Sequence, residues 1–187
     1  MRYPPGRCYG GGTDVPLADG WDRLLPDWLD TLRPLGVATV WSSPLGRCRL
    51  PAERLGAALG VPVRLDPRLR EIDFGDWEGR DWNDVPRDLL DVWGSDPIGF
   101  SAPGGEGGGS LIRRIRSVLH DLSAAAVNCL VVSHGGPLRL LGPMLQGAPP
   151  DLLAAAPPMG TIQVVCAALP SHALPPGSDG DDEGAMT

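Results

Sequence analysis

The sequence predicts an α/β fold, a three-layer α/β/α sandwich with helices on both faces of a mostly parallel sheet. Short, continuously apolar runs at 37–41, 130–132 and 162–168 suit strands that are buried on both faces, and 61–65 is a weaker fourth candidate. Segments with helical periodicity lie between these runs. This alternation is typical of a parallel sheet whose strands are connected by helices.

Five segments are predicted to be helical. The clearest is 110–126, where Leu111, Ile115 and Val118 share one face and arginines lie opposite. Pro137 suits the first turn of a helix, whereas Pro51 lies within a predicted helix, where proline removes a backbone hydrogen bond. The helices are expected at 17–34, 45–59, 84–93, 110–126 and 137–145, and the glycine-rich stretch 101–109 is expected to be a loop.

Length and composition indicate one globular domain. The chain has 187 residues, of which 42% are hydrophobic. We expect the domain to cover 1–168 and a disordered acidic tail to cover 169–187, which is rich in proline and glycine and holds four acids and no arginine. The remainder is close to neutral, which argues against the clustered positive charge of a nucleic-acid surface.

The four cysteines indicate neither a zinc site nor a disulfide framework, because they are far apart and form no C-x-x-C pair. No apolar run has the length of a membrane span, and the N-terminus has no apolar signal region. We therefore expect a cytoplasmic protein without a membrane partner. The sequence does not predict an oligomeric state.

Two polar motifs follow predicted strands at points where helices begin. Ser133-His134-Gly135-Gly136 follows one strand, and Ser42-Ser43-Pro44 leads to Arg47 after another. Ligands bind at the carboxyl ends of strands in such sheets, and glycines at a helix N-terminus let backbone N–H groups approach an anion. Arginine can grip two phosphate oxygens at once. Taken singly, His134 suits a structural role and Arg47 a place on the surface.

A third motif is acidic. Residues 69–79 place Glu71, Asp73 and Asp76 close to two aromatic residues and two glycines. A carboxyl group that aromatic rings shield from water holds a raised pKa and can donate a proton. The alternative is a solvated acidic loop.

Together the three motifs resemble the histidine phosphatase, or phosphoglycerate-mutase-like, superfamily. The pattern runs S-S-x-L-x-R, then L-R-E-x-D-F-G-x-W-E-G, then V-V-S-H-G-G, and the resemblance covers about 6–168. Segments 8–17 and 103–106 resemble its α-ribazole phosphatase branch. The resemblance implies a phosphoglycerate-mutase-like fold and a phosphomonoesterase that forms phosphohistidine. The implied substrate is a small phosphate ester, α-ribazole 5′-phosphate in cobalamin assembly, and no metal or cofactor is implied.

The resemblance also implies roles for residues. Arg47, His134 and Gly135 are expected to bind the phosphoryl group, with His134 and Glu71 as catalytic residues and Glu71 as the proton donor. The substrate is expected to contact three residues of the branch-specific segments, namely Tyr9, Thr13 and Glu106.

The sequence departs from the family at its start. The family's first strand and its Arg-His-Gly motif, which supplies the attacking histidine, have no counterpart, and His120 and His172 are not expected to replace it. Three explanations remain open: a misassigned start codon, a truncated gene, or a non-catalytic phosphoester-binding relative. A phosphatase or mutase acting on another small phosphate ester is a further alternative. Extra glycines at 10–12 and 107–109 are expected to loosen substrate positioning.

Overall fold

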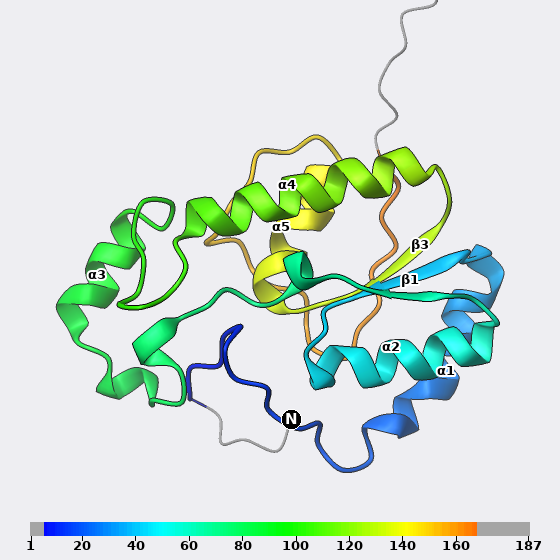
Figure 1. Ribbon diagram of the computed structural model, residues 1–187, viewed down its shortest axis with the longest axis horizontal. Coiled ribbons are helices and arrows are strands. Elements are labelled where there is room, and N and C mark those ends of the chain that lie inside the picture. Colours follow the sequence, from blue (N-terminus) through cyan, green and yellow to red (C-terminus); the bar gives the residue numbers. More distant parts are fainter. Residues whose placement is uncertain (1–5, 168–187) are drawn as a thin grey trace, which may run out of the picture.

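The computed structural model describes residues 6–167, so the predicted tail at 169–187 lies outside the described residues. Its sheet has three parallel strands, β1 (Thr39–Ser42), β2 (Val63–Leu65) and β3 (Cys129–Val132), in the order β2-β1-β3 (Figure 1). Val40 of the central strand pairs with Val63 on one side and Leu130 on the other. The parallel α/β prediction is confirmed.

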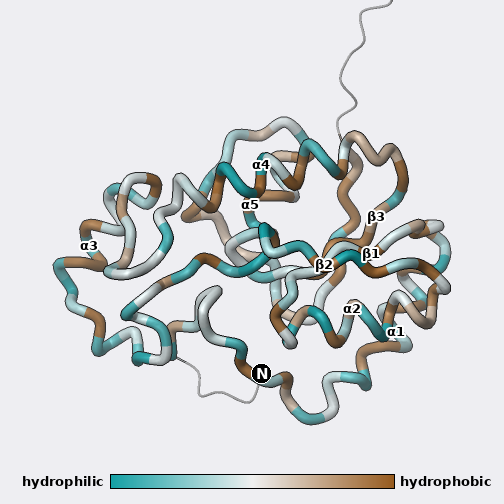
Figure 2. The backbone as a smooth tube through the Cα atoms, in the orientation of Figure 1, coloured by the Kyte–Doolittle hydropathy of each residue, from teal (hydrophilic) through white to brown (hydrophobic). Residues whose placement is uncertain are grey.

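Helices cover both faces of the sheet. The helices α1 (Leu25–Leu32) and α2 (Gly46–Leu59) lie on one side, and α4 (Gly108–Ala125) and α5 (Gly135–Leu145) lie on the other (Figure 1). Trp41 of β1 packs into a core with α4 and α5, while Val40 faces α2. Figure 2 shows β3 as hydrophobic along its length, and hydrophobic and hydrophilic stretches alternate along α4.

The connecting segments differ in detail from the helices that periodicity predicts. The 17–34 segment is α1 between two 3₁₀ turns, Trp21–Leu24 and Arg33–Leu35. A 3₁₀ turn at Trp82–Asp84 precedes α3 (Arg87–Ser95), because Pro86 stands at the helix start and has no backbone N–H to continue the turn. Two further 3₁₀ turns are Pro67–Leu69 and Gly75–Trp77, and α2 is continuous through Pro51.

A second, aromatic core lies beneath α3. It surrounds the buried Trp77 and Cys8, and Trp82 stacks on Trp93 with ring centroids 6.0 Å apart. Phe74 meets both of these rings edge-on. This core ties the N-terminal segment to the chain that follows Glu71, since Cys8 N–H donates to Arg80 O across it.

The strand predicted at 162–168 is wrong for the described part, because 162–167 is irregular chain. A strand is held by hydrogen bonds to a neighbour, and no described strand pairs with this segment or with the far edge of β3. Val164 is accordingly 62% exposed. The family's first strand, which the sequence is expected to lack, has no counterpart among the described strands, and the segment at 162–167 does not pair with β3 in its place.

Candidate active site

Arg47 lies in the first turn of α2, directly after β1. Asp14 accepts a hydrogen bond from Gly46 N–H at 2.8 Å and thereby caps this helix. The Arg47 side chain is buried, and its Nη1 and Nη2 donate to the carbonyls of Thr13 and Gly10 at 2.6 and 2.9 Å. Its Nε donates to His134 Nδ1 at 3.1 Å.

His134 ends the loop after β3 and stands at the N-cap of α5. Because arginine can only donate, the Nδ1 atom of His134 carries no proton, and its Nε2–H points to Ser43 Oγ at 2.8 Å. Burial, and then the nearby charge of Arg47, lower the pKa of His134 to about 3. The ring is therefore neutral at pH 7 and offers an N–H donor rather than a positive charge.

Cys48 lies against the His134 ring, with its Sγ 3.5 Å from Nε2 and 3.3 Å from the Ser133 carbonyl. Burial raises the pKa of the Cys48 thiol to about 12, so it remains a protonated donor to that carbonyl. The thiol and Ser43 fix the plane of the imidazole from two sides.

Glu71 reaches the same helix terminus from the segment after β2. Both of its carboxylate oxygens accept from Gly136 N–H, at 3.1 and 3.2 Å, and Ile72 N–H donates to Oε1 at 3.0 Å. A Cβ on Gly136 would stand 2.2 Å from Glu71 Oε1, so any side chain at this position would displace the Glu71 carboxylate. Desolvation raises the pKa of the Glu71 carboxyl, although the backbone donors and Arg47 act against this.

Arg47, His134, Gly135 and Glu71 therefore meet at the N-terminus of α5, and the roles expected of them remain predictions. Of the predicted substrate contacts, Thr13 approaches Arg47 through its carbonyl only, and Tyr9 is partly buried. Glu106 lies behind the Glu71 segment, where both of its oxygens accept from Arg114. These assignments remain predictions.

A cavity of about 130 Å³ borders Glu71. Its walls include Gly11, Arg70, Asp73 and Arg114. Neither Arg47 nor His134 lines it.

Sequence reasoning missed several supporting residues. Ser43 belongs to a motif that the sequence already singles out, so its place beside His134 had a detectable signal. Cys48 and Arg114 had none, because each acts through a contact between distant parts of the chain.

The family is decided by a comparison with family models. The model of the histidine phosphatase superfamily (branch 1) matches residues 3–166. The chain belongs to this superfamily. Among solved structures, the α-ribazole phosphatase from Shigella flexneri superposes with a TM-score of 0.68 at 29% identity, over 76% of this chain and 73% of that one. Its likeness confirms the phosphoglycerate-mutase-like fold.

Other relatives carry names with different activities. A putative phosphoserine phosphatase 2 from Hydrogenobacter thermophilus is 33% identical over 59% of this chain, which spans only 57% of that relative. A probable phosphoglycerate mutase from Erwinia tasmaniensis is 34% identical over 74% of this chain and 67% of the relative. None of the helices within 6–167 is long and apolar enough to cross a membrane.

Proposed function

We propose that this chain carries the phosphate-binding and proton-donating part of a phosphomonoesterase site. The observation that supports this most directly is the contact of Arg47 Nε with His134 Nδ1, beside a Glu71 carboxyl held on Gly136 N–H. Three of the five guanidinium N–H groups of Arg47 have protein acceptors. The other two, with the N–H of Gly135 at the start of α5, are those that we assign to phosphate oxygens, since the Gly136 N–H is taken by Glu71.

The proposed reaction proceeds through phosphohistidine. A histidine nitrogen attacks phosphorus, the bond to the leaving oxygen breaks, and protonated Glu71 gives that oxygen its proton. Water then attacks phosphorus while the Glu71 carboxylate takes the proton, and the histidine is released. The raised pKa of Glu71 supports its holding a proton before the first step.

The attacking histidine is a separate requirement. Both ring nitrogens of His134 are engaged, one donating to Ser43 and the other accepting from Arg47, so neither has a free lone pair with which to attack phosphorus. His120 is exposed on α4 beside Asp121, and His172 lies outside the described residues. We therefore expect attack on phosphorus to need a histidine other than these, and binding without turnover is the second candidate function.

We propose α-ribazole 5′-phosphate as the substrate. The support is the likeness to an α-ribazole phosphatase and the sequence of segments 8–17 and 103–106. Phosphoserine and phosphoglycerate are the alternatives that the names of the two other relatives suggest. A cytoplasmic location remains a prediction.

Two preparations test the proposal: the 187-residue chain and a version that begins at upstream in-frame codons. We expect both to bind orthovanadate, and only the version with an added histidine to hydrolyse p-nitrophenyl phosphate and to trap phosphohistidine. The same version is then assayed on α-ribazole 5′-phosphate, phosphoserine and 3-phosphoglycerate. His134→Ala should weaken vanadate binding to both. If either of the two preparations fails to bind vanadate, the proposed site is refuted.

A further inference from the structure

We propose that Arg114 of α4 is a positioning residue that holds the segment of Glu71 in place, an inference that rests on the proposed function of Glu71 as the acid. All five N–H groups of its guanidinium have acceptors. Nη1 donates to the carbonyls of Arg68 and Arg70, and Nη2 donates to the Glu71 carbonyl at 3.1 Å. The remaining two donate to the Glu106 carboxylate at 2.8 and 2.9 Å.

The segment depends on these side-chain donors because it has little regular structure of its own. The chain runs from a short 3₁₀ turn at Pro67–Leu69 into an irregular stretch, so its carbonyls lack helix or sheet partners. Arg114 serves three of the four carbonyls of residues 68–71, and Ser133 Oγ donates to the fourth, that of Leu69, at 2.7 Å. Lysine has only three donors and no planar fork, so it cannot replace this arrangement.

The charge of Arg114 is matched locally. Glu106 takes two of its N–H groups, and the backbone of Glu106 donates to Asp73 O at 2.7 Å, which extends the same support beyond Glu71. The cations that act on the Glu71 carboxyl are instead Arg47 and Arg139. Arg114 therefore acts on Glu71 by placing its backbone, which directs the carboxyl onto Gly136 N–H.

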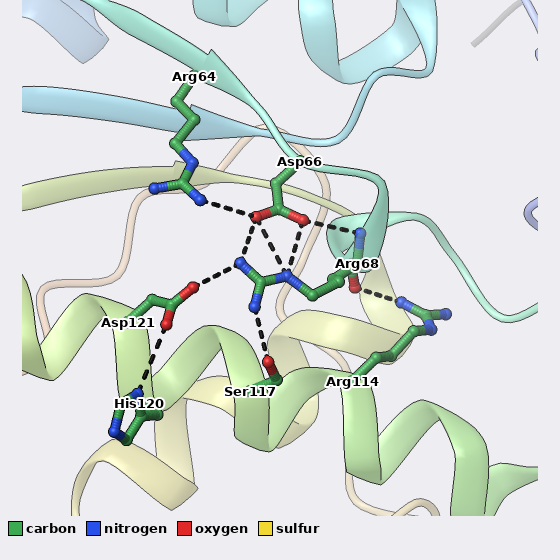
Figure 3. Close-up of polar contacts among 7 residues, drawn as sticks. All are labelled: Arg64, Asp66, Arg68, Arg114, Ser117, His120 and Asp121. Atoms are coloured by element: carbon green, nitrogen blue, oxygen red, sulfur yellow. Dashed lines mark hydrogen bonds and ion pairs between the residues drawn. The ribbon is translucent and has the colours of Figure 1, made fainter.

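A second arginine joins the same two elements but does not touch Glu71. Arg68 Nη2 donates to Asp121 and its Nη1 to Ser117, both in α4 and both at 2.7 Å (Figure 3). The buried carboxylate of Asp66 accepts hydrogen bonds from Nε and Nη2 of the same guanidinium. Figure 3 shows the link from Arg114 to the Arg68 carbonyl alongside this network. Asp121→Ala thus removes a connection between the two elements and leaves the carbonyls of residues 70 and 71 supported.

The test follows the Glu71 carboxyl by ¹³C NMR across pH in the full 187-residue chain, with Glu71→Gln identifying its signal. We expect Arg114→Ala to lower the Glu71 pKa toward the ordinary value of a glutamate, because a loosened segment admits water to the carboxyl. Asp121→Ala should lower thermal stability yet leave the Glu71 titration unchanged. Arg114→Lys should shift the titration in the same direction as Arg114→Ala.

The proposal is overturned if the pKa of Glu71 in Arg114→Ala equals that of the wild type. It is also overturned if the pKa in Arg114→Lys equals the wild-type value. An equal shift in Asp121→Ala also overturns it, since general loosening of α4 would then suffice. If Arg114→Ala does not fold, the Arg114→Lys titration decides. Vanadate binding to the wild-type chain is measured in parallel. Its absence refutes the proposed function, while the titrations still report on Arg114.

In a catalytically active, extended form, Arg114→Ala should lower kcat by about 100-fold, because a small misplacement of a catalytic group costs that much. KM should change by less than about threefold, since the phosphate ligands are elsewhere. Loss confined to KM, with kcat unchanged, contradicts a positioning role for Arg114.

Discussion

Neutral His134 makes the stability of the fold depend on pH in a calculable way. Its pKa is about 3 in the folded chain and 6.5 as the reference value of the unfolded one. The unfolded chain therefore binds the extra proton first, so stability is present above pH 6.5 and is lost as pH falls toward 3. At about 1.4 kcal/mol per pH unit, His134 alone removes about 2 kcal/mol from the free energy of unfolding between pH 7.5 and 5.0.

Urea unfolding of the wild type and His134→Asn at several pH values isolates this contribution, because asparagine can still accept from Arg47 but does not titrate. We expect the difference in free energy of unfolding to fall by about 2 kcal/mol over that range. The raised pKa of Glu71 changes the stability with pH in the direction opposite to that of His134. The comparison of the wild type with His134→Asn is therefore repeated in chains that also carry Glu71→Gln. The lowered pKa of Asp66 contributes stability that is present above pH 3.8 and is lost only as pH falls below that value, and it is common to both chains. A difference constant to within about 0.5 kcal/mol would refute a neutral, buried His134.

Three further outcomes are expected. Gly136→Ala should lower kcat of an active form by about 100-fold, because its Cβ would displace the carboxylate of the acid; unchanged turnover would contradict that contact. Gly108→Ala should lower the free energy of unfolding by about 2 kcal/mol in urea titrations, since its Cβ would meet a backbone carbonyl, whereas Gly94→Ala, with open space, should be neutral or slightly stabilising. Iodoacetamide at pH 8 should alkylate exposed Cys166 at least about tenfold faster than buried Cys48, measured by mass spectrometry of the folded chain; equal rates would contradict the buried thiol.

The strands β1 and β3 and the convergence of Arg47, Glu71 and His134 could be predicted, because the chain pattern and the sheet geometry coincide, while the roles of these residues remain proposals. β1 and β3 are short apolar runs, and each ends at the same edge of a parallel sheet, so the polar residues that follow them must converge. The 162–168 run has the same apolar character and fails as a strand in its described part. Composition reports how a segment suits a sheet, but only a hydrogen-bonding neighbour makes it a strand.

One of the extra glycines, Gly108, has a structural role that the sequence does not predict. Gly108 lies in the first turn of α4, and a Cβ there would stand 2.0 Å from Pro97 O. Close packing, rather than loop freedom, accounts for glycine at this position. A pattern of glycines cannot distinguish these cases, because the contact that requires the glycine comes from a segment eleven residues earlier and depends on the fold.

The arginines of α4 show most clearly where a helical pattern stops being informative. Arg113, Arg114 and Arg116 all lie off the apolar face, and the pattern predicts the same solvated role for each. Arg113 and Arg116 are exposed, whereas Arg114 is partly buried with all of its donors in use. The difference comes from what faces each side chain. Of the three, only Arg114 faces the Glu71 segment. The carbonyls of that segment have no helix or sheet partner, because the segment leaves the sheet to bring its carboxyl to the start of α5. The need for a five-donor side chain therefore arises from the site itself.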